Sequence, residues 1–188
     1  GEHFDYRYAL RDVGHASGKG EPGERPSTLV YRDNLLDFAA PNVYRGLTGL
    51  FRVFDELDSG DETGARHPDT NLRLPSGDRD LPLVLHDVRL DADGQLAYAP
   101  FDRAPADLNA ALGDRILVNG RIQPYLTVAR RKYRFRIVNG SVARLYAVQL
   151  TDGHGRPRPF DHLVATGGGF LARPLSAVEH LLIAATER

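Results

Sequence analysis

The chain has 188 residues, 41% of them hydrophobic and 26% charged, with a formal net charge of −1. These values suit a globular protein of one or two domains, and the near-neutral charge gives no support for nucleic acid or an anionic membrane as a partner. The lack of Cys excludes disulfides, thiolate metal ligands and a cysteine nucleophile. Since the chain also lacks Met, we expect it to be a processed or partial product of a longer sequence.

The N-terminal residues predict a strand, a loop and a second strand. Residues 4–9 alternate aromatic and polar side chains, which is typical of a half-buried strand. Residues 14–26 contain four Gly and two Pro among polar residues and predict a loop. Residues 28–31 form a short run of strand-forming residues.

The next segments lead into a polar linker. Residues 35–45 are irregular and predict at most one helical turn, which breaks at Pro41. Residues 49–54 predict another strand. Residues 55–80 are polar and contain Gly, Pro, Asp and Ser throughout, so we interpret them as a linker between two halves of the chain.

The second half begins with a mostly apolar strand at residues 81–90. Asp93 and Gly94 suit a tight turn into a strand at residues 95–98. Residues 99–112 predict a loop that contains a short helix.

Residues 115–126 carry the strongest local signal in the chain. Asn119 and Gly120 stand between two runs of strand-forming residues, and both residue types tolerate the positive φ angles of a type I′ hairpin. Further turns are predicted at residues 139–140 and 167–169, and further strands at residues 145–150 and 181–184.

Residues 132–138 alternate strictly between basic side chains and aromatic or aliphatic ones. Successive residues of a strand point to opposite faces, so we expect Tyr133 and Phe135 in the core and Arg134 and Arg136 on a solvated face. The same basic run also fits nucleic-acid binding, but a solvated strand face is the favoured interpretation, and no nucleic-acid partner is expected.

Short, closely spaced strands with few helical periods predict an all-β Greek-key sandwich or barrel. Stretches that cover most of the chain, in the right order, resemble the three-domain multicopper oxidases, in particular the branch of spore-coat laccase, bilirubin oxidase and phenoxazinone synthase. These stretches are NVYRGLTGLF from Asn42, LPLVLHD from Leu81, ILVNGRIQPYL from Ile116, ARRKYRFRIVNGS from Ala129 and LIAATER from Leu182.

The resemblance implies a cupredoxin-like Greek-key β-sandwich. Residues 1–55 match the end of a first, incomplete cupredoxin domain, residues 56–80 a linker, and residues 81–188 a second cupredoxin domain that lacks its last strands. Such a sandwich would expose unpaired strand edges. We therefore expect a fragment whose partners are the remaining cupredoxin domains of a parent protein, or a complementary chain.

In the family, a Trp-Tyr-His-Asp-His motif precedes the NVYRG stretch, and its two histidines ligate different coppers of a trinuclear centre. The matching residues here are Val30, Tyr31, Arg32, Asp33 and Asn34, so Arg32 and Asn34 stand at both ligand positions. Arg does not deprotonate to bind a metal, and its charge repels a copper cluster. We therefore expect no metal ligands and no cofactor in this chain, although copper is the cofactor of the family.

No other histidines match a copper site. His86 lies in an apolar strand, where a hydrogen-bonded core or rim residue is favoured over a metal ligand. His154 and His162 flank a loop that would bring them together if it folded back, but two separate loop histidines are favoured. The remaining histidines lack a partner at ligand spacing: His3, His15, His67 and His180.

Three functions remain open. The favoured one is a pseudoenzyme with a scaffold or binding role, since copper-free relatives with such roles exist in the superfamily. The second is the middle portion of a working laccase-type oxidase of phenols or aminophenols that uses dioxygen and holds its coppers in segments not present here. The third is another activity in the old cleft. Loss of two ligands would cripple electron transfer to dioxygen, which favours the first.

Overall fold

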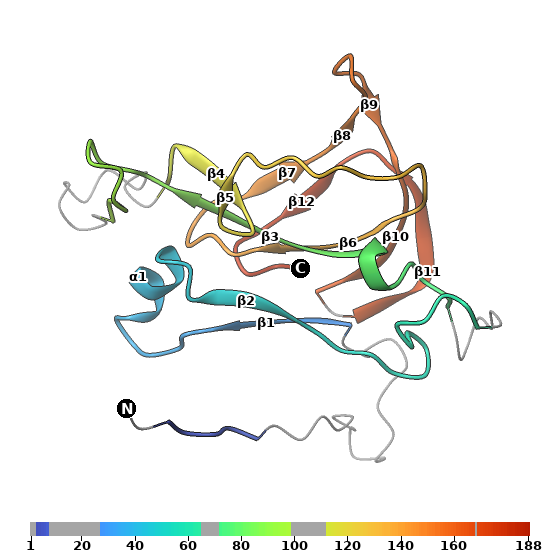
Figure 1. Ribbon diagram of the computed structural model, residues 1–188, viewed down its shortest axis with the longest axis horizontal. Helices are drawn as coiled ribbons and strands as arrows, with labels where there is room; N and C mark the ends of the chain where they lie inside the picture. The colour runs from blue at the N-terminus through green and yellow to red at the C-terminus, as the bar shows by residue number, and fades with distance from the viewer. Residues whose placement is uncertain (1–2, 8–26, 65–71, 99–111, 168) are drawn as a thin grey trace.

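Strands dominate the computed structural model, which describes residues 3–7, 27–64, 72–98, 112–167 and 169–188 (Figure 1). Within these residues the helical elements are α1 (Ala39–Tyr44) and the 3-10 turn η2 (Gly77–Arg79). The strands are β1 (Thr28–Arg32), β2 (Thr48–Arg52), β3 (Asp80–Val88), β4 (Arg115–Val118), β5 (Arg121–Ile122), β6 (Arg134–Asn139), β7 (Tyr146–Val148), β8 (Leu150–Thr151), β9 (Pro157–Arg158), β10 (Phe160–Thr166), β11 (Gly169–Val178) and β12 (Leu181–Ile183). The predicted all-β class is confirmed.

The central sheet has the strand order β5-β4-β3-β6 (Figure 1). β3 pairs in parallel with β6, with Leu83 opposite Ile137, and antiparallel with β4, with His86 opposite Leu117. β3 therefore has neighbours on both edges, whereas β6 is an edge strand of this sheet.

The turn between β4 and β5 forms as predicted. Asn119 has φ 50° and Gly120 has φ 77°, the left-handed geometry that a type I′ hairpin requires at both central residues. The Asn119 side chain also ties the hairpin to β3. Its amide donates to the Pro82 carbonyl at 2.9 Å, and its oxygen accepts from the Val84 N–H at 2.8 Å.

Smaller ribbons cover the central sheet on both sides (Figure 1). The antiparallel pair β1–β2, with α1 between its strands, lies on one side, and the pairs β7–β12 and β10–β11 lie on the other. A further antiparallel pair, β8–β9, ends in a projecting turn. The buried apolar side chains are Val43, Tyr44, Val88, Val138, Phe170 and Ile183.

Two predictions for the first half are wrong. Residues 3–7 form no strand, and Phe4 and Tyr6 are largely exposed, because none of the described strands pairs with this segment. Pro41 does not break the helix, because it lies in the first turn of α1, where a backbone N–H would have no partner within the helix.

The turn after β3 forms at Asp93-Gly94 as predicted, but a single bridge from Leu90 to Leu96 replaces the strand expected at residues 95–98. The loop predicted at residues 14–26 lies outside the described residues, as does nearly all of the one at 99–112. Neither helix of the described segments has the length and apolar character needed to cross a membrane.

Candidate functional site

The corner after β1 holds the residues at the predicted positions of the lost copper ligands. Arg32 is the last residue of β1, and Asn34 lies beyond the strand, so the alternation of β1 does not extend to Asn34. Both side chains are exposed. Asp33 between them accepts hydrogen bonds from the Asn42 amide at 2.6 Å and the Leu35 N–H at 2.9 Å.

These hydrogen bonds give Asp33 a structural role at this corner. The bond from Asn42, followed by that from Leu35, holds the pKa of the Asp33 carboxyl below its usual value. Asp33 therefore stays ionised and joins the end of β1 to α1.

Tyr31, the other residue that the family motif retains, packs across the β1–β2 ribbon. It lies opposite Gly49, and a Cβ placed on Gly49 would come within 2.3 Å of the Tyr31 ring. Gly49 thus makes room for the ring. Tyr31 and Asp33 therefore both shape the corner.

The donor chemistry of this corner does not fit copper. The guanidinium of Arg32 is a permanent cation without a lone pair for a metal, and the carboxamide of Asn34 is a weak ligand for copper compared with imidazole. Among the described residues, no group of three or more His, Asp or Glu side chains is arranged to hold a metal ion.

His86 is the buried histidine of the described chain, at 7% exposure. Its Nε2 is buried without a hydrogen-bond partner, so the hydrogen-bonded role predicted for it is not met at this atom. Burial lowers the pKa of His86, and the nearby Asp87 carboxylate opposes that shift only in part. The ring packs edge-on against Tyr44, with centroids 6.2 Å apart.

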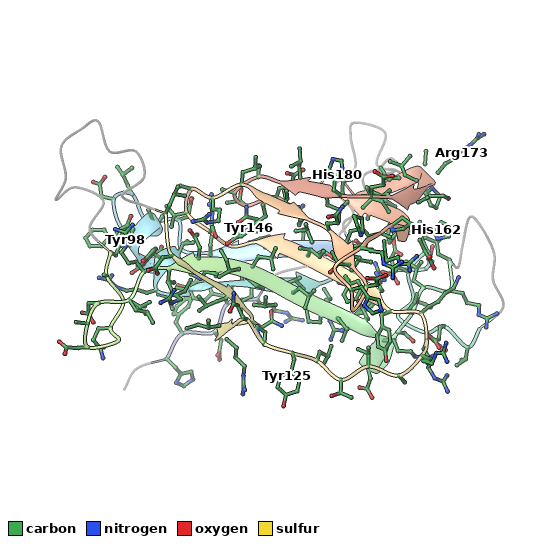
Figure 2. The ribbon with its side chains drawn as sticks, turned by 90° about the horizontal axis from the view of Figure 1, so that it is seen from above. Tyr98, Tyr125, Tyr146, His162, Arg173 and His180 are labelled. Carbon is green, nitrogen blue, oxygen red and sulfur yellow. The ribbon has the colours of Figure 1, made fainter. Side chains whose placement is uncertain are left out.

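The other described histidines are exposed. His154 lies in the turn between β8 and β9, and His162 lies on β10. Figure 2 shows His162 and His180 at separate places on the surface. His3 is also exposed, whereas His15 and His67 lie outside the described residues.

A buried ionic cluster, formed by Asp58, Asp80, Arg134 and Arg136, lies beneath β6. Arg134 Nη1 is 2.6 Å from Asp58 Oδ2, and Arg136 binds both oxygens of Asp80 at 2.8 and 2.9 Å. None of the four side chains exceeds 8% exposure. Burial is the main reason that the pKa of Arg134 falls below its ordinary value, although Asp58 opposes that effect.

The cluster overturns the prediction of a solvated basic face. Arg134 and Arg136 are buried, and Phe135 between them is 40% exposed. The predicted alternation is present, but the basic side chains face inward, because Asp58 and Asp80 supply the partners that let two guanidinium groups leave water. Asp58 comes from the segment interpreted as a linker, and no local pattern marks it as a partner of β6.

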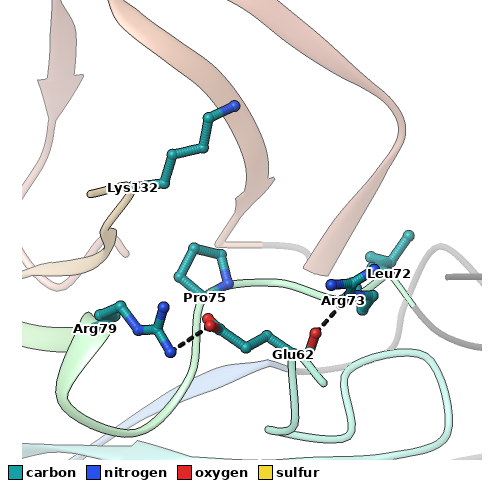
Figure 3. Close-up of a pocket in the computed structure, with 6 residues that line it drawn as sticks. All are labelled: Glu62, Leu72, Arg73, Pro75, Arg79 and Lys132. Carbon is teal, nitrogen blue, oxygen red and sulfur yellow. Dashed lines mark hydrogen bonds and ion pairs between the residues drawn. The ribbon is translucent and has the colours of Figure 1, made fainter. Parts of the chain in front are cut away.

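Two concave regions lie along β6 and the segment before it, and no pattern in the sequence predicts either. A groove of about 1040 Å³ lies between β6 and the β10–β11 hairpin. A cavity of about 330 Å³ adjoins it, lined by Glu62, Leu72, Arg73, Pro75, Arg79 and Lys132 (Figure 3).

The sequence is similar to known oxidases and to a cell division protein. No protein-family model matches it. A laccase of Haloferax volcanii is 36% identical over 86% of this chain and 26% of its own length. A laccase of Bacillus subtilis is 35% identical over 78% of this chain and 27% of its own length. The cell division protein FtsP of Dickeya dadantii is 37% identical over 86% of this chain and 30% of its own length.

The fold is similar to that of the McoA multicopper oxidase from the hyperthermophile Aquifex aeolicus. The TM-score is 0.70 at 33% identity, over 88% of this chain and 33% of that structure. A variant of McoA, 2F4, has a TM-score of 0.72 at 34% identity. The chain therefore spans about a quarter to a third of the proteins it resembles. With this sequence similarity and this cupredoxin-like β-fold, the chain belongs to the multicopper oxidase family.

Proposed function

We propose that this chain is a scaffold or binding part of a larger multicopper-oxidase-like protein and supplies no copper ligands itself. The observation that carries the proposal is the corner after β1, where Arg32 and Asn34 stand at the positions that the family resemblance assigns to a histidine pair. A fixed positive charge at such a position opposes the binding of a copper cluster. Asp33 is held by Asn42 and supports the corner instead.

The similar proteins include a cell division protein as well as laccases. The name of the cell division protein FtsP refers to a cellular process rather than to an oxidation. A role in binding or assembly for the protein that contains this chain is consistent with that similarity.

We also propose the division of the chain that the resemblance implies. Residues 1–55 would end a first cupredoxin-like domain, residues 56–80 would link, and residues 81–188 would form most of a second. In support, β1 and β2 pair with each other and with none of the other described strands. The partners would then be the remaining cupredoxin domains, or a chain that supplies complementary strands.

The alternative is a working laccase-type oxidase of small aromatic substrates such as phenols or aminophenols. It would reduce dioxygen with coppers held by segments outside this chain. The identity of 36% and 35% to two laccases favours this alternative.

Copper analysis of the full-length gene product separates the two functions. We expect no stoichiometric copper after reconstitution and no blue absorption band, with the Bacillus subtilis laccase prepared in parallel as the positive control. Two or more coppers per chain together with a blue band would overturn the scaffold proposal.

A further inference from the structure

We propose that the tip of the β8–β9 hairpin, residues 152–158, binds an acidic segment of a partner protein through the guanidinium groups of Arg156 and Arg158. This inference rests on the binding role proposed above and names the chemistry of the partner. The shape of the tip, the convergence of its two arginines and the size of the basic patch support it.

The hairpin projects from the body of the molecule (Figure 1). β8 and β9 pair antiparallel, with Leu150 opposite Arg158 and Thr151 opposite Pro157. Residues 153–159 are all exposed. The tip can therefore meet a partner without any rearrangement of the sheets behind it.

Asp152 fixes the shape of the tip. Its Oδ1 accepts hydrogen bonds from the N–H groups of His154 at 2.9 Å and Arg156 at 3.0 Å. Its own N–H donates to the Arg156 carbonyl, and the Gly155 N–H donates to the Asp152 carbonyl, both at 2.9 Å. The N–H groups of Arg156 and His154 also hold the pKa of the Asp152 carboxyl below its usual value. A turn that is already ordered in this way loses little conformational entropy when it binds a partner.

The second oxygen of Asp152 brings the two arginines together. Nη2 of Arg158 is 3.1 Å from Oδ2, and Nε of Arg156 is 3.7 Å from the same atom. Arg156 and Arg158 are also two residues apart, the spacing at which side chains of an extended chain share a face. Both guanidinium groups therefore lie on one face of the hairpin.

Both arginines keep hydrogen-bond donors for a ligand. Their side chains are 70% and 62% exposed, whereas that of Asp152 is 19% exposed. A guanidinium carries several N–H donors, and the 3.7 Å between Arg156 and Asp152 is too long for a hydrogen bond. Since two guanidinium groups face one carboxylate, the patch is basic overall.

The size of the patch separates the possible anionic partners. Anionic membranes are recognised by clusters of about 4–8 basic residues, and nucleic acids by roughly 6–10 phosphate contacts. Two arginines, in a chain whose net charge is −1, are too few for either. They match two carboxylates on a short extended segment, which arginine binds through paired N–H···O bonds.

Fluorescence anisotropy with the full-length gene product tests the inference. The probe is a labelled eight-residue peptide that alternates Glu and Thr, because carboxylates at every second position share one face of an extended chain. The buffer has low ionic strength, since salt screens exposed charges. We expect saturable binding, and binding at least about tenfold weaker for the analogue with Gln at every Glu position, because charge-assisted hydrogen bonds are the stronger ones.

Protein variants locate the binding. The double variant Arg156→Gln/Arg158→Gln should bind the Glu peptide at least about fivefold more weakly. Its turn should still form, because Asp152 holds backbone N–H groups there. The matched control is Arg121→Gln/Arg130→Gln, which removes the same charge at exposed positions in and after β5. Its affinity should not change.

Failure to bind the Glu peptide, equal binding of the Gln analogue, or equal binding by Arg156→Gln/Arg158→Gln would overturn the inference. So would tighter binding of an oligonucleotide or of phosphatidylserine vesicles than of the peptide, if the same double variant abolished it. None of these outcomes involves copper. A copper-loaded full-length protein would instead overturn the scaffold proposal and leave the peptide result standing, so the two failures are distinguishable.

Discussion

Arg136 and Asp80 form a two-point ion pair between β6 and β3, with Nε 2.8 Å from Oδ1 and Nη2 2.9 Å from Oδ2. Asp58 adds a second acceptor for Nη2 at 3.2 Å. Arg136 also donates to the Ser27 carbonyl, just before β1. One guanidinium therefore connects the central sheet to both the β1–β2 ribbon and the segment that follows it.

Removing the Arg136 guanidinium should lower the free energy of unfolding substantially. Arg136→Ala would leave Asp58 and Asp80 buried with Arg134 and, at 3.7 Å from Asp80, the partly exposed Arg52 as their remaining cations. Loss of one partner of a buried ion pair typically costs about 3–5 kcal/mol, so we expect the urea unfolding midpoint to fall sharply. Lys132→Ala, at an exposed position, is the control and should change stability by less than about 0.5 kcal/mol. A loss below about 1 kcal/mol for Arg136→Ala would show that the cluster adds little to stability.

The Tyr44 hydroxyl docks α1 onto the segment after β3. It accepts from the Arg89 N–H at 2.6 Å and donates to the Ala97 carbonyl at 3.0 Å. Tyr44→Phe removes both bonds without removing the ring, and we expect a loss of about 1–3 kcal/mol because the bonds are partly shielded from water. Tyr125→Phe is the control. Equal unfolding midpoints for the two variants would contradict a docking role for the hydroxyl.

Gly113 lies against the backbone of β3. A Cβ at this position would come within 2.3 Å of the Val88 nitrogen and 2.5 Å of its carbonyl oxygen. Gly113 also donates its N–H to Asp87 Oδ2 at 2.7 Å. Because backbone atoms yield less readily than side-chain ends, Gly113→Ala should destabilise the protein by about 1–3 kcal/mol or more.

The control for this variant is Gly153→Ala, since no atom lies within 4 Å of the added Cβ and φ is not positive. Calorimetric melting of both variants measures the difference. If the two melting temperatures agree within error, the close approach of Gly113 to β3 does not contribute to the stability of the protein.

His86 should make stability depend on pH. Burial lowers its pKa, so below about pH 6.5, the ordinary value, the unfolded chain binds a proton that the folded chain does not. The free energy of unfolding should therefore fall as the pH drops from about 6.5 toward the lowered pKa.

Urea unfolding at pH 7.5 and pH 5.5 measures this slope, and His86→Gln should reduce it. His154→Gln, in an exposed turn, controls for the loss of an imidazole elsewhere. An unchanged slope in His86→Gln would mean that His86 does not contribute to the pH dependence.

Local signals in the sequence were sufficient for much of the fold. Asn119-Gly120 predicted a hairpin because few other residue pairs adopt two positive φ angles at low cost. The apolar run that begins at Leu81 predicted β3, whose residues are half-buried or buried. The strand predicted at the N-terminus does not form. Phe4 and Tyr6 alternate as in a strand, but none of the described strands pairs with this segment.

The sequence by itself determined the strand periods, the turn positions and the identity of Arg32 and Asn34, because these depend on residue type and near neighbours. Only the tertiary structure decided which face of β6 is buried. Alternation separates Arg136 from Phe135, but the choice of inner face depends on Asp58 and Asp80, which lie 78 and 56 residues away along the chain. Likewise, the groove along β6 exists because of where the β10–β11 hairpin lies, and long-range packing of that kind leaves no local pattern in a sequence.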